Sequence, residues 1–407
     1  AFKAHVDDVE VGGIVVVDED EFTKVNLRKA GYAEGYNPLD DEKFLKQYKL
    51  YRVPITRLNR QTLEESGLGA KAIGRSRNMF ALGLAYWLYD RPLETTTRFF
   101  REYYGTKKNQ PAVADANEKA LKAGYYFGET AEIFPVRYHV AKAIVPAGRY
   151  RKVTGNEAVA MGLVAGSKLA QKDLVYCSYP ITPASSILHN LATMRHFGDK
   201  TFQAEDEMAA ICAAIGASFA GQLGVCGTSG PGFALKAEAL NLAVVAELPL
   251  VIVNVQRGGP STGWPTKTEQ ADLLQTMFGR NSDSPVVIIA PRSPADCFEV
   301  AIEALRTTIR TMTPVVILSD GYLGEGAEPW RIPAVETLGG VEVTRPGSDD
   351  VGPGGFKPYQ RDDHLARPWA VPGTPGLEHR IGGLEKEHET GNVSYDSENH
   401  QLMTLLR

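Results

Sequence analysis

The strongest constraint on the fold is a regular alternation of short apolar runs and helix-length segments between residues 151 and 330. Strands that alternate with helices of about 10–15 residues form a parallel sheet with helices on both faces. The predicted strands are residues 174–178, 201–204, 224–227, 250–255, 286–290 and 315–320. The sequence therefore predicts an α/β fold with a doubly wound parallel sheet, and ligands in such sheets bind at the carboxyl ends of the strands.

Helices are predicted between these strands. The first begins near Thr154 or Asn156, either of which can cap it, and runs to about residue 169. The others are residues 185–195, 207–221, 233–247, 269–278 and 294–310.

The segments on either side of this pattern are less regular. Residues 1–135 form a first α/β region, with strands predicted at 12–18 and 48–55 and helices at 76–89, 95–104 and 112–126. Residues 136–150 read as a linker, and 151–330 as the central domain. Residues 331–407 are predicted to form an extended arm rich in Gly and Pro, with a last helix from residue 402. We expect the arm to pack through Tyr359, Trp369 and Leu377.

Two arginines precede the predicted helix at 76–89 or lie at its start. Arg75 and Arg77 can hold a phosphate or carboxylate, but such a pair is more often a solvated helix start or a contact with a partner. The helix itself is apolar almost all round, which predicts burial on all sides.

Composition excludes several classes of protein. The net charge of the 407 residues is −5 and there is no long basic run, so the footprint of a nucleic-acid-binding protein is absent. No apolar run approaches the roughly 18 residues of a membrane span, and the first residues lack the pattern of a signal peptide.

The cysteines indicate neither a metal site nor a disulfide framework. None of the four forms a Cys-x-x-Cys pair, and three lie in apolar surroundings, as small buried side chains do. We therefore predict no metal or iron–sulfur ligation by this chain and a cytoplasmic location.

A candidate acid lies in the sequence Gln-Ala-Glu-Asp-Glu at 203–207. Glu207 falls in the first turn of a helix of small apolar residues, where a partly dehydrated carboxylate can share a proton with a ligand nitrogen. The alternative is that the acids complement the helix dipole. We favour the dipole for Glu205 and Asp206, and both interpretations stay open for Glu207.

The sequence Gly-Thr-Ser-Gly-Pro-Gly at 227–232 follows a strand and opens a helix. Glycine lets a backbone approach a ligand closely, and a helix N-terminus favours negative charge. The turn is neither a P-loop nor a dinucleotide fingerprint, and a tight packing turn explains it at least as well.

Arg257 ends a predicted strand and precedes Gly-Gly-Pro, where its guanidinium can grip a carboxylate with two hydrogen bonds. The alternative is a structural salt bridge. Thr182 lies between two prolines that fix its backbone, although Pro-x-Thr-Pro also occurs in plain turns. Thr262, Thr266 and Lys267 add hydroxyls and a cation that can reach a second acidic group.

Four stretches together resemble the α subunit of the 2-oxoacid:ferredoxin oxidoreductases. They are Tyr-Pro-Ile-Thr-Pro-Ala-Ser (179–185), Gln-Ala-Glu-Asp-Glu (203–207), Thr-Ser-Gly-Pro-Gly (228–232) and residues 256–270, which begin Gln-Arg-Gly-Gly-Pro. Residues 318–322, 366–374 and 376–380 fit the same pattern. The likeness is strongest to the branch acting on 2-oxoglutarate, whose large subunit fuses γ and α domains, and it covers nearly all of the chain.

The resemblance implies a thiamine diphosphate site. Residues 151–330 would be the pyrimidine-binding domain, and residues 1–135 the C-terminal part of a γ-type domain. Glu207 would hydrogen-bond the pyrimidine nitrogen, and Thr182 and Arg257 would hold the 2-oxoacid. The other implied contacts are Gly230, Pro231 and Thr182 to the cofactor, Thr262 and Thr266 to the substrate pocket, and Lys267 to the distal carboxylate.

The resemblance also implies a partner. The family's diphosphate and Mg²⁺ motif is Gly-Asp-Gly with a later asparagine, whereas this chain has Ser319-Asp320-Gly321 and no such asparagine. A β subunit would supply that half of the site and a [4Fe-4S] cluster, in a dimer of heterodimers. The implied reaction converts 2-oxoglutarate and coenzyme A to succinyl-CoA and CO₂ and reduces ferredoxin.

Three alternatives remain beside this hypothesis. Pyruvate or a broad range of 2-oxoacids would be the substrate in the same class, and Trp264 stands beside the pocket where leucine is usual. A non-catalytic structural subunit and an independent nucleotide-binding protein belong to other classes. Relative to the family pattern, the early part of the γ domain and a transketolase-C-terminal-like domain after the arm are missing.

Overall fold

The computed structural model describes residues 2–132 and 134–407. The chain divides into two compact units, Ala1–Val145 and Pro146–Arg407, and each is described by itself. Between the last helix of the first unit and the first strand of the second, residues 134–149 carry no helix or strand. Within the described residues, no helix combines the length and the apolar character that crossing a bilayer requires.

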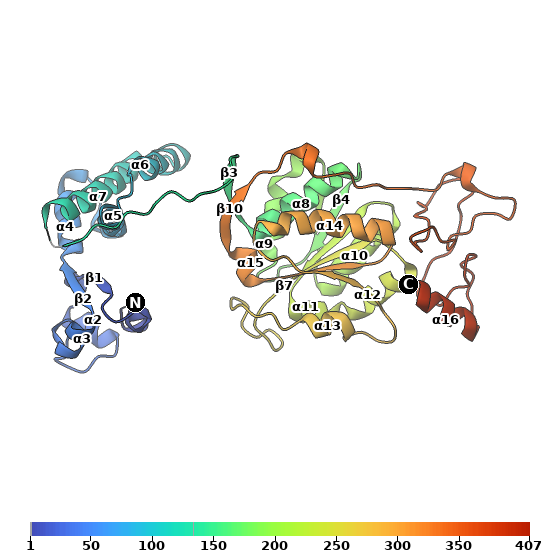
Figure 1. Cartoon of the computed structure of the whole chain (residues 1–407), viewed down its shortest axis with the longest axis horizontal. Coiled ribbons are helices and arrows are strands. Elements are labelled where there is room, and N and C mark those ends of the chain that lie inside the picture. Colours follow the sequence, from blue (N-terminus) through green and yellow to red (C-terminus); the bar gives the residue numbers. More distant parts are fainter. Residues whose placement is uncertain (1, 133) are drawn as a thin grey trace. The chain divides into compact units, whose positions relative to one another are not determined.

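The first unit joins a small parallel sheet to a set of helices (Figure 1). Strand β1 (Ile14–Asp18) pairs in parallel with β2 (Lys49–Val53). The helices are α1 (Phe2–His5), α2 (Lys24–Lys29), α3 (Glu42–Gln47), α4 (Ile55–Thr62), α5 (Ala70–Leu88), α6 (Glu94–Phe100), a π-helix (Arg101–Lys107) and α7 (Pro111–Thr130).

Helices α5 and α7 lie side by side with their backbones in contact. A Cβ at Gly83 would overlap the carbonyl oxygen of Leu121, and one at Gly124 would overlap that of Phe80. Glycine is therefore required at both positions of this crossing.

Two predictions for this unit are wrong. Helix α5 begins at residue 70, so Arg75 and Arg77 lie inside it, and Arg77 forms an ion pair with Glu21 instead of marking a helix start. The helix is buried on one face, through Phe80 and Leu84 among others, and not all round.

The second unit is built on a six-stranded parallel sheet with the order β5-β4-β6-β7-β9-β8. The strands are β4 (Leu174–Ser178), β5 (Lys200–Gln203), β6 (Leu223–Thr228), β7 (Leu250–Gln256), β8 (Val287–Ile289) and β9 (Val315–Asp320). All six predicted strands are present, and the predicted doubly wound α/β fold is confirmed.

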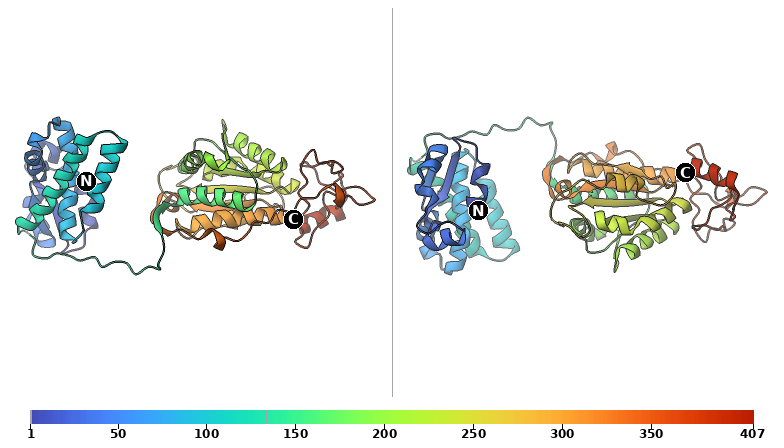
Figure 2. Two further views of the ribbon diagram at one scale, coloured as in Figure 1. Left: turned by 90° about the horizontal axis from the view of Figure 1, so that it is seen from above. Right: turned by 90° about the horizontal axis from the view of Figure 1, so that it is seen from below.

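Helices cover both faces of this sheet (Figure 2). Side chains alternate along β7: Val251, Val253 and Val255 pack in the core with α8, α9 and α14, whereas Leu250 and Ile252 pack with α10 and α12. Both faces are apolar because both are covered, which is why these strands read as continuous apolar runs. The helices are α8 (Gly155–Leu169), α9 (Ser185–Thr193), α10 (Glu207–Phe219), α11 (Gly230–Leu235), α12 (Ala237–Ala246), α13 (Leu273–Phe278), α14 (Asp296–Thr311) and α15 (Gly321–Glu325).

The predicted helices are present. Thr154 caps α8 as expected, by accepting a hydrogen bond from the Glu157 backbone N–H at 3.4 Å. The bounds of the others need correction. The single helix predicted at 233–247 is two helices, α11 and α12, which meet at Lys236. Helices α9, α10 and α13 are shorter than predicted, and α14 begins two residues later.

This unit also contains a second, two-stranded sheet that was not predicted. Strand β3 (Tyr150–Thr154) pairs antiparallel with β10 (Ala327–Arg331), so the last residue of the predicted linker, the start of the predicted central domain and the segment before the arm are strands. Most side chains of β3 are exposed, so a hydrophobicity pattern does not reveal this strand.

The arm packs against the sheet body as predicted. Tyr359, Trp369 and Leu377 are buried, and the Trp369 indole N–H donates to the Ser218 carbonyl at 3.0 Å. Its last helix, α16 (Ser397–Leu406), begins five residues earlier than predicted, behind the cap Asp396.

Candidate active site

The candidate site lies at the carboxyl edge of the sheet between β4 and β6. Strand β5 lies on one side of β4 and β6 on the other, so the direction of winding reverses here. Doubly wound sheets open a crevice at such a point. The loops after β4 and β6 and the start of α10 all reach this edge, as the sequence predicted for residues 179–183, 227–232 and 203–207.

Glu207 is the first residue of α10. The helix is capped by Asp206, whose carboxylate accepts a hydrogen bond from the Ala209 backbone N–H at 2.8 Å, as expected for an acid at a helix start. Further along the helix, Ile211 and Ala214 are fully buried, but Glu207 itself is half-buried. Its carboxylate can therefore contact a ligand without being fully buried as a charged group.

Two hydroxyl groups converge on Glu207. Tyr179 and Thr228 are buried, and their hydroxyls lie 2.9 Å apart. A Cβ at Gly232 would overlap the Tyr179 hydroxyl and would lie 2.6 Å from Thr228 Oγ1 and 3.1 Å from Glu207 Cγ. Burial raises the pKa of Tyr179, and the nearby Glu207 carboxylate raises it further, so this hydroxyl stays protonated.

The Gly-rich turn packs against a carboxylate of the chain itself. A Cβ at Gly230 would lie 2.8 Å from Asp272 Oδ2, and that oxygen accepts a hydrogen bond from Asn254 Nδ2 at 3.0 Å. Burial raises the pKa of Asp272. The close approach explains the glycine, so the packing interpretation of the turn holds; any contact of Gly230 or Pro231 with a cofactor stays a prediction.

Arg257 ties two loops of the site together. Its side chain is buried, and it donates from Nη1 to the Thr182 carbonyl at 2.7 Å and from Nη2 to the Thr262 carbonyl at 3.2 Å. Its Nε–H is buried and has no hydrogen-bond partner among the described residues. Arg257 forms no salt bridge within that part of the chain, so the salt-bridge alternative is wrong.

The loop after Arg257 is held by its own backbone. Gly258 N–H donates to the Lys267 carbonyl and Trp264 N–H donates to the Gly258 carbonyl, each at 2.9 Å. Thr262, Thr266 and Lys267 are exposed on this loop, and Trp264 is 71% exposed. The structure thus brings Thr182, Arg257 and Thr262 together and leaves Thr266 and Lys267 facing solvent.

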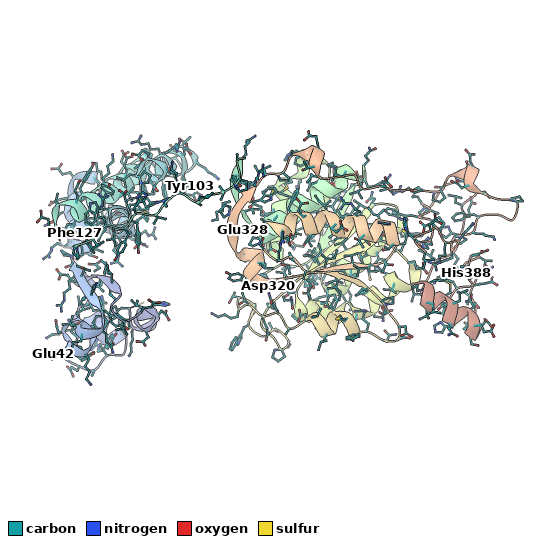
Figure 3. The ribbon with its side chains drawn as sticks, viewed as in Figure 1. Glu42, Tyr103, Phe127, Asp320, Glu328 and His388 are labelled. Atoms are coloured by element: carbon teal, nitrogen blue, oxygen red, sulfur yellow. The ribbon has the colours of Figure 1, made fainter. Side chains whose placement is uncertain are left out.

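The end of β9 is occupied by a polar network of the chain itself. Asp320, labelled in Figure 3, is buried and caps α15 by accepting from the Tyr322 backbone N–H at 2.7 Å. Its other carboxylate oxygen accepts from Gln270 Nε2 at 2.8 Å. Among the residues described, no group of three or more His, Cys, Asp or Glu side chains is arranged to hold a metal ion.

The cysteines carry no chemistry at this edge. All four thiols are free, and Cys177, Cys226 and Cys297 are buried as predicted. Burial raises the pKa of Cys177 to about 11 and that of Cys226 to about 12, so both remain thiols at neutral pH.

A cavity of about 1230 Å³ lies beneath the arm, away from the carboxyl edge. Its guanidinium groups are engaged within the chain: Arg345 with the Gly221 carbonyl, and Arg361 with the Glu247 carboxylate. The cavity therefore reflects how the arm is held.

The family follows from comparison with known proteins. Residues 166–397 match the family described as pyruvate flavodoxin/ferredoxin oxidoreductase, thiamine-diphosphate-binding, and residues 1–127 match pyruvate ferredoxin/flavodoxin oxidoreductase. The first match alone spans more than half of the chain. The chain belongs to this oxidoreductase family. The predicted resemblance and the predicted thiamine-diphosphate-binding type of fold are thereby confirmed.

Individual relatives in this oxidoreductase family point in the same direction. The chain is 52% identical to the 2-oxoglutarate oxidoreductase subunit KorA of Mycobacterium tuberculosis over 100% of this chain and 61% of that protein. It is 30% identical to the α subunit of 2-oxoacid:ferredoxin oxidoreductase 1 of Aeropyrum pernix, over 91% of this chain and 58% of that protein.

A solved structure shares the fold over the whole chain. It is the 2-oxoglutarate:ferredoxin oxidoreductase of Magnetococcus marinus with 2-oxoglutarate, coenzyme A and succinyl-CoA bound, at a TM-score of 0.83 and 31% identity over 100% of this chain and 64% of that one. The chain thus spans less than two thirds of the length of these relatives.

Sequence reasoning missed two residues of the site, Tyr179 and Asp272. Tyr179 stands directly after a predicted strand, where strand ends meet, and that position could have drawn attention to it. Asp272 lies near the start of a predicted helix.

Proposed function

We propose that the chain is the fused γ/α subunit of a 2-oxoglutarate:ferredoxin oxidoreductase. The reaction converts 2-oxoglutarate and coenzyme A to succinyl-CoA, CO₂ and a proton, and passes two electrons singly to two ferredoxins. The proposal is supported by the hydrogen bond from Arg257 to the Thr182 carbonyl and by the position of Glu207 at the start of α10, at the carboxyl edge of a sheet in the thiamine-diphosphate-binding family. The identity with the 2-oxoglutarate subunit of Mycobacterium tuberculosis supports the choice of substrate.

The residues present fit the pyrimidine half of thiamine diphosphate. When bound, this cofactor supplies a carbon nucleophile and an electron sink for decarboxylation of a 2-oxoacid. Glu207 would bind its ring nitrogen, because its half-buried side chain lies near Tyr179 and Thr228 at the carboxyl edge of the sheet. Gly230 and Pro231 would line the neighbouring wall.

Arg257 and Thr182 would bind the 2-oxoacid. Two of the five guanidinium N–H groups are used by the loop carbonyls, which leaves three, including the unpartnered Nε–H, for a carboxylate. Thr182 is exposed, and its hydroxyl belongs to the same residue whose carbonyl accepts from Arg257. Thr262 and Thr266 would line the pocket, and Lys267 would meet the distal carboxylate that distinguishes 2-oxoglutarate from pyruvate.

A β subunit would complete the site with the diphosphate half, Mg²⁺ and a [4Fe-4S] cluster, in a dimer of heterodimers. Asp320 caps a helix and is not free to take the diphosphate half. Large apolar side chains are exposed on the elements around the site and offer a surface for such a partner: Phe202, Met208, Leu235, Leu274 and Phe278. The four cysteines of this chain are free thiols, and we therefore expect the complex to work in the reducing cytoplasm.

The substrate is tested with the full complex. Coenzyme-A-dependent reduction of a viologen dye is measured with 2-oxoglutarate and then with pyruvate, and we expect 2-oxoglutarate to have the higher kcat/KM. Faster turnover of pyruvate would contradict the substrate assignment and favour the broader 2-oxoacid class.

The catalytic role is tested by Glu207→Gln, with Glu205→Gln as the matched control. Both remove one charge at the start of α10, but Glu205 is exposed and outside the helix. We expect Glu207→Gln to abolish turnover while the subunits still assemble, and Glu205→Gln to keep it. Near-normal turnover of Glu207→Gln would refute the catalytic role of Glu207.

A further inference from the structure

Lys236 is a lysine buried directly behind the site. It stands where α11 meets α12, and it is 0% exposed. Its backbone is satisfied, since its N–H donates to the Phe233 carbonyl at 3.1 Å and its carbonyl accepts from Leu240 N–H at 2.9 Å. Its Nζ, in contrast, is buried without a hydrogen-bond partner in the part of the chain that the structure describes. A buried cation without such a partner is costly, so its position calls for a reason.

The ammonium group faces the aromatic ring of Tyr179. Nζ lies 4.2 Å from the ring centroid, within the range of a cation–π interaction. The hydroxyl at the far end of the same ring contacts Thr228 and lies in the cluster with Glu207. Lys236, Tyr179 and Glu207 therefore form one continuous group that leads from the core to the crevice.

The charges around Lys236 single out one partner. Burial lowers the pKa of its ammonium, and the groups that oppose this are the Cys226 thiol and the carboxylates of Glu207 and Asp206. Burial raises the pKa of Cys226 to about 12, so it carries no charge at neutral pH. Asp206 is committed to the cap of α10. Glu207 is the remaining carboxylate.

We propose that Lys236 is a positioning residue whose charge holds the Tyr179 ring in place and thereby directs the Glu207 carboxylate toward the crevice. The proposal rests on the proposed role of Glu207 toward the cofactor. It differs from plain core packing, in which the side chain of Lys236 fills space and its charge has no consequence at the site.

The test is a double-mutant cycle on the affinity of the full complex for thiamine diphosphate, measured by titration calorimetry. Lys236→Met keeps the length of the side chain and removes the charge, and Lys236→Arg keeps the charge. We expect Lys236→Met to weaken binding about tenfold, the order of effect of a nearby opposite charge. Lys236→Arg should restore most of that loss. In a Glu207→Gln background, the Lys236 charge lacks its carboxylate partner. There, Lys236→Met should lower the affinity for thiamine diphosphate less than about twofold.

Two results would overturn the proposal. Equal losses in both backgrounds would assign Lys236 to core packing, and no loss in either would remove it from the site. If the Lys236→Met complex fails to assemble, Lys236→Gln is carried through the same cycle with the same criteria. Failure of the proposed function is distinguishable, because then Glu207→Gln alone would leave cofactor affinity and turnover unchanged.

Discussion

Replacing Gly232 by alanine tests the packing on which the site depends. The added Cβ would overlap the Tyr179 hydroxyl and would lie 2.6 Å from Thr228 Oγ1. Neither side chain can move into solvent, because Tyr179 is 4% and Thr228 is 0% exposed. Separating them breaks their 2.9 Å hydrogen bond and leaves two buried hydroxyls without a partner.

The magnitude follows from three effects. Overpacking costs about 1–3 kcal/mol, and unpaired buried hydroxyls cost about 1–3 kcal/mol. Alanine in place of glycine within α11 returns about 1 kcal/mol. We therefore expect Gly232→Ala to lower the free energy of unfolding by about 3 kcal/mol, which is about 6–12 °C in Tm for a unit of this size. Because Glu207 Cγ is also crowded, thiamine diphosphate affinity should fall as well.

Gly216→Ala is the matched control. Gly216 is an exposed glycine of α10, and an added Cβ there meets nothing within 4 Å. Thermal unfolding of the three proteins, followed by circular dichroism, should show Gly216→Ala at or slightly above the wild type. A Gly232→Ala protein with the wild-type Tm and cofactor affinity would refute the reasoning.

Three further predictions concern separate parts of the second unit. Asp206→Ala removes the acceptor of the hydrogen bond from Ala209 N–H, so it should lower the free energy of unfolding, measured by thermal unfolding, by about 1 kcal/mol. Asp206→Asn keeps an acceptor and should stay within about 0.5 kcal/mol of the wild type. Arg257→Lys cannot reach both loop carbonyls, so limited proteolysis of the two loops should quicken several-fold; wild-type cleavage rates would argue against the tie. Burial works against ionisation of Glu385, but hydrogen bonds from Arg407 and other groups outweigh it and lower its pKa to about 2. The ionised carboxylate therefore adds about 3 kcal/mol to the free energy of unfolding. This stabilisation is complete above pH 4.5 and disappears as the pH falls through about 2. Hydrogen exchange of α16 should lose protection in that window, and Glu385→Gln should abolish the dependence.

The central fold could be predicted because it is encoded locally. Most central strands are apolar runs, with β5 the polar exception, and both faces of β7 are covered, so β7 reads apolar throughout. The pairing of β3 with β10 could not be predicted, since it joins distant and mostly polar segments. The break at Lys236 was missed because lysine is a good helix former and no glycine or proline marks the junction.

The site was predictable in its location but not in its contacts. Strand ends placed Thr182, Glu207 and Arg257 at one edge, because parallel strands share that edge. The sequence does not show that Arg257 is held by backbone carbonyls, since any residue supplies a carbonyl. The approach of Asp272 to Gly230 likewise depends on the path of a loop, which periodicity does not specify.

The shared guanidinium of Arg257 also bears on kinetics. Because the loops carrying Thr182 and Thr262 hold the same side chain, neither can swing outward without releasing the other or carrying Arg257 with it. Joint movement of the two loops keeps both hydrogen bonds, so it is favoured over separate movement. Spectroscopic labels on the two loops would then relax with one common rate constant.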